Sequence, residues 1–283
     1  MSERNPILYT LPPLVDAEVV KRPSKHIKSP YVADIVIDGD DYLGHTPALG
    51  CCGLIDKGKI VRAYKVDGKK CDYRIALCQV QEKGHTITIG TAPKMAEKIV
   101  KEALLRNLVR DLPGKVVKSE KKILNSRFDF IGRTTGNVPF ILEVKNVPLA
   151  DYEDIYAKER KKRNYDDRAW DSKIAYFPDG YRKKVTDTVS PRALKHVNEL
   201  CEVKKRYGDQ IRCALMFVIQ RNDVASFQPS RIDPIYLEAV RDAWKHGVEI
   251  KTLQIGWEEN NAYFIRNDLP VNLFDDCNHC VLP

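Results

Sequence analysis

A continuous apolar run at residues 213–220 (CALMFVIQ) places the strongest constraint on the fold of this chain. A strand that is apolar at every position must be covered on both faces. Apolar residues recur at helical spacing before it, in residues 191–207, and after it, in residues 235–246, and residues 248–255 indicate another strand. This order predicts an α/β unit with a mixed sheet, in which the run at 213–220 is central.

The N-terminal third is β-rich and differently organised. After Pro93 the apolar spacing becomes helical as far as Leu112. We therefore expect a barrel domain with an irregular N-terminal extension at residues 1–90, followed by an α/β domain at residues 91–283. A small barrel is indicated by about five short strands with tight turns, near residues 14–20, 31–38, 60–66, 73–80 and 85–89.

A predicted β-hairpin, formed by residues 127–131 and 139–146, carries the candidate chemistry. Because side chains alternate along a strand, Glu143 and Lys145 project from one face, and Asp129 meets Glu143 across the pair. Two carboxylates and an ammonium suit a hard divalent cation and the stabilisation of negative charge on phosphate. The plainer interpretation is a solvated strand face with a Glu–Lys ion pair.

The net charge of +8, from 47 Lys and Arg residues against 39 Asp and Glu residues, favours an anionic partner. No apolar run approaches the roughly 20 residues that span a bilayer, and the first residues lack the pattern of a signal peptide. We expect a soluble intracellular protein, cytoplasmic or nuclear, with no membrane partner. The eight cysteines are too dispersed for a disulfide framework, and Cys277 and Cys280 have the spacing of only half a zinc knuckle.

Basic and aromatic residues supply candidate contacts to nucleic acid. Small barrels often bind single-stranded nucleic acid through such side chains, and two further basic groups lie close in sequence to the hairpin. Each group is also compatible with an ordinary solvated surface, which is the usual role of charge runs such as those after the hairpin. The candidates are Arg62, Lys65, Tyr73, Arg74, Lys161, Lys162, Arg163, Arg182, Lys183, Lys195 and His196.

Several blocks of residues occur in the same order as in a known family. They are Lys101-Glu-Ala-Leu104, Ser126-Arg-Phe-Asp-Phe130, Leu142-Glu-Val-Lys-Asn-Val147, Tyr176-Phe-Pro-Asp179, Ala193-Leu-Lys-His-Val197, Phe217-Val-Ile-Gln-Arg-Asn-Asp223 and Arg231-Ile-Asp-Pro234. In these blocks the chain resembles the sugar fermentation stimulation protein family of the restriction-endonuclease-like superfamily. The resemblance extends from about residue 31 to about residue 255.

The resemblance implies an OB-like barrel, a restriction-endonuclease-like α/β domain and DNA binding. By position, it assigns Mg²⁺ or Mn²⁺ to Asp129 and Glu143, with the Val144 carbonyl as a further ligand, and activation of the attacking water to Lys145. An acidic residue from the first helix often joins such a site. Glu102 is the best candidate, although it also fits a solvated helix acid.

The leading hypothesis is a DNA-binding protein with a Mg²⁺-dependent nuclease site, in which Asp129, Glu143 and Lys145 are the catalytic residues. One alternative is a non-catalytic DNA-binding regulator that retains the nuclease fold. Another is an OB-type protein that binds RNA or another polyanion.

Overall fold

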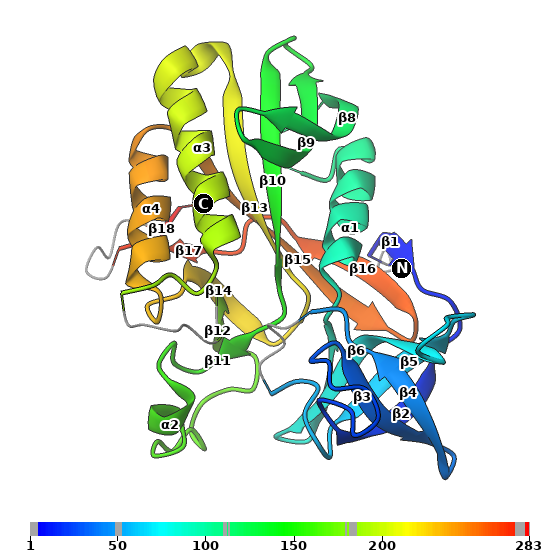
Figure 1. Cartoon of the computed structure of the whole chain (residues 1–283). Helices are drawn as coiled ribbons and strands as arrows, with labels where there is room; N and C mark the ends of the chain where they lie inside the picture. Colours follow the sequence, from blue (N-terminus) through cyan, green and yellow to red (C-terminus); the bar gives the residue numbers. More distant parts are fainter. Residues whose placement is uncertain are drawn as a thin grey trace.

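The computed structural model describes residues 5–48, 53–109, 112, 114–178, 180, 186–274 and 281–282, without the side chains of residues 114–121 and 281–282. In this part of the chain, a small β-barrel lies beside a larger α/β unit (Figure 1). The expected mixed α/β class is confirmed.

The α/β unit is built on a seven-stranded sheet. In spatial order its strands are β1 (Ile7–Thr10), β16 (Asn261–Arg266), β15 (Glu249–Glu258), β13 (Arg212–Ile219), β10 (Pro139–Val147), β9 (Ser126–Thr134) and β8 (Gly114–Ile123). The central strand, β13, is parallel to β10 and β15, whereas the outer pairings are antiparallel. The sheet is therefore mixed, as the order of elements predicts.

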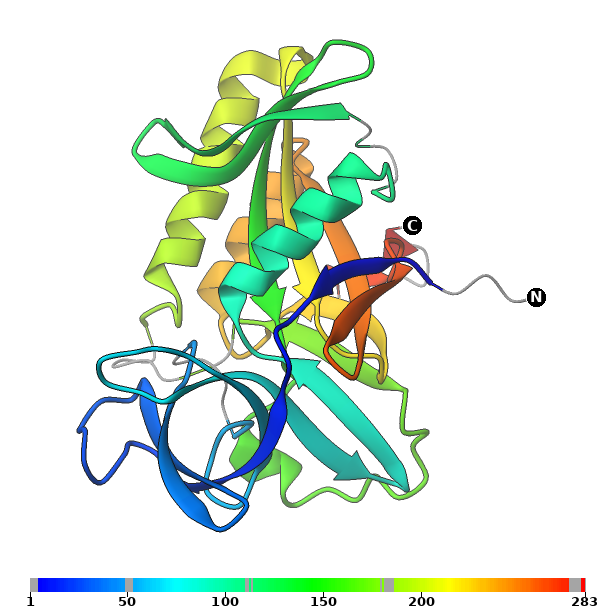
Figure 2. The same ribbon diagram turned by 90° about the vertical axis from the view of Figure 1, so that its right-hand side faces the viewer.

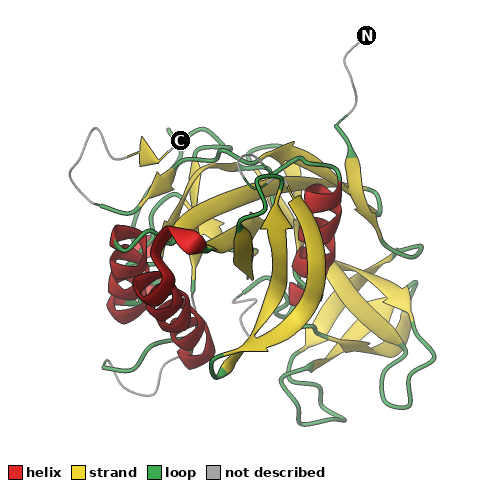
Figure 3. Cartoon of the chain, turned by 90° about the horizontal axis from the view of Figure 1, so that it is seen from above, coloured by secondary structure: helices red, strands yellow, loops and turns green. Residues whose placement is uncertain are grey.

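Helices cover both faces of β13, as its continuous apolar sequence requires. Its odd-numbered residues from 213 to 219 enter a core with α3 (Pro191–Tyr207) and α4 (Pro234–Lys245). Its even-numbered residues from 214 to 218 enter a second core with α1 (Pro93–Leu105). Seen from above, α3 and α4 stand on one side of the sheet and α1 on the other (Figure 3). All three helices begin with proline. α3 and α4 match their predicted positions within one residue, whereas α1 ends at Leu105 and not at the predicted Leu112.

The N-terminal third of the chain forms an OB-like barrel. Its strands are β2 (Val15–Lys21), β3 (Val32–Ile37), β4 (Asp40–His45), β5 (Ile60–Lys65), β6 (Tyr73–Glu82) and β7 (His85–Gly90). They follow the order β4-β3-β2-β5-β6-β7, and a parallel pairing of β4 with β6 closes the ring (Figure 2). The expected number of strands was one too low, because β4 contains Asp and Gly residues that resemble a turn.

A third sheet is formed by strands that follow the hairpin in sequence. Its strands are β11 (Ala150–Asp151), β12 (Lys173–Phe177), β14 (Val224–Pro229), β17 (Val271–Asn272) and β18 (Val281–Leu282). The highly charged segment between β11 and β12 contains one short helix, α2 (Ala157–Arg160). A single 3₁₀ turn, η1 (Gly208–Gln210), follows α3.

The two halves are connected at several points. β7 leads into α1 near the predicted boundary between residues 90 and 91, whereas β1 precedes the barrel in sequence but pairs with β16 of the α/β sheet. The domain boundary remains a prediction. β1 falls within residues 1–90 by sequence but belongs to the sheet of the α/β unit. Among the described residues, none of the helices is both long enough and apolar enough to cross a lipid bilayer.

Candidate functional site

The predicted hairpin forms and then opens at its base, where Asp129 lies. β9 and β10 pair as far as Phe130↔Leu142, a register that makes Asp129 and Glu143 the next pair. There the backbone ladder stops, and Asp129 Oδ2 accepts a 2.7 Å hydrogen bond from the Val144 N–H. Because backbone N–H groups away from water need partners, the Asp129 carboxylate replaces the missing ladder bond.

Glu143 is the centre of a buried polar cluster. The residue is only 2% exposed. Its Oε1 accepts hydrogen bonds from Lys145, two residues along the same strand, and from Nδ1 of His196 on α3. Its Oε2 is buried and has no hydrogen-bond partner among the described residues. Burial of an unpartnered carboxylate oxygen is costly, so this atom is an open ligand position.

The two carboxylates differ in their ionisation. Burial and the neighbouring Glu143 raise the pKa of Asp129 to about 7, against the opposing effects of the Val144 N–H and Lys145. Burial alone would raise the pKa of Glu143, but His196 and Lys145 outweigh it and lower that pKa. Crowded carboxylate oxygens are the ligands that hard divalent cations prefer. The residues present therefore fit such a cation.

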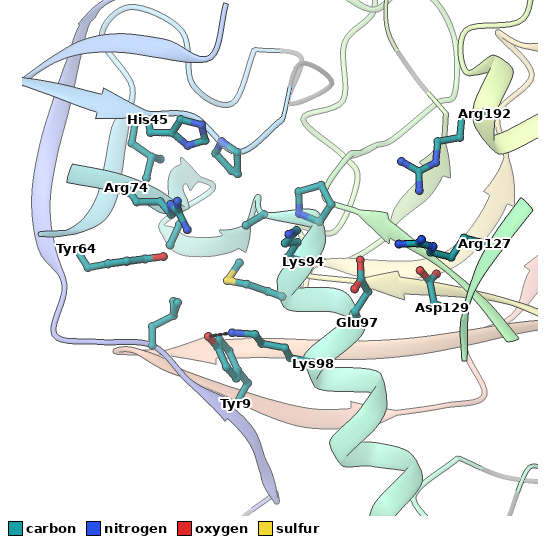
Figure 4. A pocket seen from close by; sticks show the side chains of 17 residues that line it. Tyr9, His45, Tyr64, Arg74, Lys94, Glu97, Lys98, Arg127, Asp129 and Arg192 are labelled. Atoms are coloured by element: carbon teal, nitrogen blue, oxygen red, sulfur yellow. Dashed lines mark hydrogen bonds between the residues drawn. The ribbon is translucent and has the colours of Figure 1, made fainter. Parts of the chain in front are cut away.

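The acidic residue that α1 brings to this site is Glu97. It lines the same cavity as Asp129, and the two carboxylates lie side by side (Figure 4). The charge of Glu97 also contributes to the raised pKa of Asp129. Glu102 lies five residues further on, roughly 140° around the helix at 3.6 residues per turn, and forms a 2.7 Å ion pair with Arg106. The expectation of an acid from the first helix thus fits Glu97 better than Glu102.

Two cavities meet at the carboxylate cluster. The first, of about 600 Å³, lies between the barrel and the α/β unit. The second, of about 830 Å³, extends past Glu143 and Lys145 toward β12 and the start of α3. A molecule in either cavity reaches the carboxylates, because the two share Pro93, Glu97, Asp129 and Arg192.

The predicted nucleic-acid contacts lie only partly at these cavities. Arg74 lines the first cavity, and His196 is buried at the carboxylate cluster with 4% exposure. Arg62 instead forms a 3.0 Å ion pair with Asp16 and donates to the Glu259 carbonyl at 2.7 Å. The remaining described candidates line neither cavity; they are Lys65, Tyr73, Lys161, Lys162, Arg163 and Lys195.

Several of these basic side chains have protein partners. Lys162 pairs with Glu159 at 3.4 Å, Arg163 with Glu153 at 3.7 Å, and Lys195 donates to the Asn125 carbonyl at 2.9 Å. Surface pairs of this kind reduce the charge available to a ligand. Outside the described residues lie four positions named from the sequence, Arg182, Lys183, Cys277 and Cys280.

Sequence reasoning missed most of the basic residues that line the first cavity. They are Lys94, Lys98, Arg127 and Arg192. Lys94 and Lys98 are four residues apart, which places them on one face of α1. Arg127 precedes the Phe128-Asp129 dipeptide within a family block, which was the available signal. Nothing in the sequence alone brings Arg192 of α3 to the same place.

A separate group of metal-ligand types joins α3 to α4. Cys201, Asp242 and His246 present ligand atoms within 4.8 Å of one another. The Lys205 ammonium already contacts Asp242 at 3.2 Å, and both residues of this ion pair are about half exposed at their side chains. The Lys205 ammonium therefore already balances the Asp242 carboxylate in this cluster. None of the three residues lines either cavity.

Comparison with known proteins places this geometry in a family. The protein-family model described as "Sugar fermentation stimulation protein RE domain" matches residues 94–158 and 167–261, which is more than half of the chain. The chain belongs to the sugar fermentation stimulation protein family. The family member from Carboxydothermus hydrogenoformans is 26% identical over 240 residues, covering 83% of this chain and 90% of its own. The one from Jannaschia sp. is 29% identical over 246 residues, covering 84% and 86%.

A solved structure of the family shares the complete architecture. SfsA from Pyrococcus furiosus, in complex with Ca²⁺, has a TM-score of 0.72 at 19% sequence identity. The match covers 94% of this chain and 99% of that chain. The family fold therefore includes both the OB-like barrel and the α/β unit.

Proposed function

We propose that this family member binds DNA and carries a phosphodiesterase site that depends on Mg²⁺ or Mn²⁺. The observation that carries the proposal is the buried Glu143 carboxylate, which has one oxygen without a partner among the described residues. Asp129 lies beside it with a raised pKa. A cation between these groups would neutralise their repulsion and occupy the open ligand position. The Ca²⁺ bound by the Pyrococcus relative is consistent with such a site.

In this proposal, Asp129 and Glu143 hold the cation, and Glu97 from α1 completes the acidic set. A bound divalent cation supplies Lewis-acid polarisation of a phosphate oxygen. Lys145, which is 9% exposed, keeps its ammonium beside Glu143 and orients the attacking water. His196, on α3, fixes the rotamer of Glu143 through its hydrogen bond, so the carboxylate is positioned before substrate arrives.

DNA is the proposed partner because the approach to the carboxylates is cationic. Lys94, Arg127 and Arg192 lie around Glu97 and Asp129 at the first cavity, and Lys98 lines the same cavity beside Tyr9 (Figure 4). Cationic side chains around a metal site hold phosphates in position and supply affinity without sequence preference. The chain's net charge of +8 acts in the same direction.

The decisive experiment incubates purified protein with linear, circular and single-stranded DNA in the presence of Mg²⁺ or Mn²⁺. Wild type is expected to cleave at least one substrate, with no cleavage in EDTA. Asp129→Asn and Lys145→Met are expected to lower the cleavage rate by about 100-fold or more. Cleavage that persists unchanged in EDTA or in both variants would contradict the proposal.

A matched pair of acids on α1 tests the metal site separately from turnover. Glu97→Gln is expected to weaken Mn²⁺ binding by about tenfold or more, the effect that even outer-shell changes have on metal affinity. Glu102→Gln removes the same charge from the same helix and is expected to bind Mn²⁺ as wild type does. Electron paramagnetic resonance of free Mn²⁺ measures both. The reverse ranking would move the metal ligand to Glu102.

A non-catalytic DNA-binding function is favoured by one observation. Lys145 and His196 already donate to Glu143, so part of its charge is compensated without a cation. In that case wild type and Asp129→Asn bind DNA equally and leave every substrate intact with either metal. Competition between DNA and RNA across a salt series distinguishes a general polyanion binder, for which both would weaken in parallel.

A further inference from the structure

The first cavity is lined by both halves of the molecule. The barrel contributes His45, Tyr64 and Arg74, and α1 contributes Lys94 and Lys98 (Figure 4). The carboxylates of Glu97 and Asp129 lie at the end of the cavity that faces the α/β unit. A ligand that fills the cavity therefore contacts the barrel and the proposed metal site together.

The lining of this cavity is positively charged, and several of its cationic side chains have no protein counter-ion among the described residues. Arg74, Lys94 and Arg192 are exposed, and none of them makes a hydrogen bond or ion pair with any described residue. Arg62 on the adjacent strand is different, because Asp16 binds its guanidinium. Cations without protein counter-ions on a concave surface concentrate positive potential, which attracts phosphate groups. The lining holds five cationic side chains, Arg74, Lys94, Lys98, Arg127 and Arg192, against two acids, Glu97 and Asp129.

Ring systems line the side of the cavity nearer the barrel. Tyr64 and His45 come from β5 and β4, and Tyr9 comes from β1 (Figure 4). Lys98 lies over the Tyr9 ring, with Nζ 5.2 Å from its centroid and 3.3 Å from its hydroxyl. His45 Nδ1 is buried without a hydrogen-bond partner among the described residues, and burial and Arg74 lower the pKa of this imidazole. Together these rings give the cavity surfaces on which a base can stack.

This combination of rings and unpaired cations matches one form of nucleic acid. Single-strand binding sites combine a basic groove for the backbone with aromatic rings on which bases stack. In a duplex the bases are paired and stacked on each other, so they offer no free face to a side chain unless one is flipped out. A cavity of about 600 Å³ is also in the size range of sites for small ligands rather than for a double helix.

We infer that this cavity binds an unpaired strand of DNA, with phosphates on Arg74, Lys94 and Arg192 and bases against Tyr64 and His45. The strand then leads to Asp129 and continues into the second cavity past Glu143. This inference rests on the proposed function in one respect, because it makes the strand in the cavity the one that reaches the metal site. It goes further in naming an unpaired strand as the substrate class.

The test measures binding without turnover. Fluorescence anisotropy follows a labelled 12-nucleotide single strand, and the duplex of the same sequence, in Ca²⁺ and in EDTA across a salt series. The single strand is expected to bind at least about tenfold more tightly than the duplex. Lys94→Gln is expected to reduce the slope of log affinity against log salt by about 0.7, the value for one lost phosphate contact on a single strand. Tyr64→Leu is expected to weaken single-strand binding about fivefold or more.

Matched variants separate the cavity from charge in general. Lys245→Gln removes the same charge from an exposed lysine of α4 that lines neither cavity, and it is expected to leave affinity and salt slope unchanged. Lys94→Arg keeps the charge and is expected to retain wild-type affinity. Melting temperatures identify any variant that fails to fold. If Tyr64→Leu does not fold, the comparison of Lys94→Gln with Lys245→Gln, both at exposed positions, decides the result.

The outcomes distinguish this inference from the proposed function. Equal binding of duplex and single strand, or wild-type affinity in Lys94→Gln and Tyr64→Leu, overturns the inference even if the protein cleaves DNA. Single-strand binding that is lost in those variants supports the inference, even if no DNA is cleaved with Mg²⁺ or Mn²⁺. In that second case only the phosphodiesterase proposal fails.

Discussion

At the scale of single residues, burial decides what a polar side chain does. His196 is 4% exposed, donates to Glu143 and lies with its ring centroid 5.7 Å from that of Phe128. Its neighbour in sequence, Lys195, has a side chain that is 52% exposed, lies 3.8 Å from Glu199 and donates to the Asn125 carbonyl at 2.9 Å. Both were candidates for contacts to nucleic acid, yet only His196 lies against the carboxylate cluster.

His196→Leu is expected to lower the free energy of unfolding by ~1–3 kcal/mol in EDTA, because the buried Glu143 loses a donor. Urea denaturation measures the change. Lys195→Ala, the adjacent exposed control, is expected to stay within about 0.5 kcal/mol of wild type. Equal effects of the two changes would mean that the contact between His196 and Glu143 contributes nothing to stability.

The sequence identifies the residue types at the site better than their partners. Alternation along a strand is a local property, so the neighbouring positions of Glu143 and Lys145 follow from sequence alone. The pairing of Arg62 with Asp16 is not local, since 46 residues separate them. Choosing Glu97 over Glu102 requires the rotation of α1 relative to the sheet, which only packing determines.

At the scale of elements, the helix starts show how local signals and distant contacts combine. Ser190 caps α3 by accepting from the Ala193 N–H at 3.4 Å, and Asp233 caps α4 by accepting from the Tyr236 N–H at 3.1 Å. Asp233 also accepts from the Thr188 hydroxyl at 2.6 Å and the Val189 N–H at 2.7 Å. One buried carboxylate therefore starts α4 and holds the segment before α3.

Asp233→Ala is expected to cost more stability than Ser190→Ala. Loss of a single N-cap costs ~1 kcal/mol, which is the expectation for Ser190. Asp233 is fully buried and leaves three donors without their acceptor, so a loss of ~3 kcal/mol or more is expected. Chemical denaturation of the two variants measures the ranking, and equal losses would show that the contacts to residues 188 and 189 are energetically neutral.

The same contrast explains which elements were predictable. Ser-Pro and Asp-Pro are recognisable helix starts, so α3 and α4 were located correctly. β4 is absent from the sequence prediction because Gly39, Asp40 and Asp41, at its start, favour a turn when considered alone. Its strand conformation depends on β3, and its pairing with β6 links residues about 30 positions apart.

At the scale of the whole molecule, a buried charge network joins the barrel to the α/β unit. Lys173 of β12 contacts Glu82 of β6 at 2.6 Å and Asp223 at 2.7 Å. Arg221 binds the same Asp223 at 2.6 Å. Asp223 is fully buried, and Arg221 and Lys173 are 4% and 3% exposed. The contact of Lys173 with Glu82 thus ties β6 of the barrel to β12.

Asp223→Asn is expected to destabilise the protein in a pH-dependent way. Burial would raise the pKa of Asp223, but Arg221 and Lys173 outweigh it and lower that pKa. A carboxyl with a folded pKa below its unfolded value of about 3.9 stabilises the protein above that pH and loses this effect as the pH falls through the folded pKa. The variant is therefore expected to be ~3–5 kcal/mol less stable than wild type at pH 7, with a smaller difference below about pH 4.

Urea unfolding at neutral and acidic pH measures this difference. Asp67→Asn, a change at an exposed position of the barrel, serves as the control and is expected to stay within about 0.5 kcal/mol at both pH values. A stability difference for Asp223→Asn that does not vary with pH would show that the ionised carboxylate is not what joins the network.

The pairing of β1 with β16 has a consequence for how the chain is made. The Thr10 hydroxyl donates to Asn261 at 2.7 Å across 251 residues of sequence. During synthesis, β1 leaves the ribosome long before its partner, and the barrel strands that follow it can assemble while it waits. β1 can join the sheet as its edge strand only when β16 has been made. A gene cut at the barrel boundary would therefore yield one fragment with a strand that has lost its partner and another with an open edge, prone to pairing with a second copy.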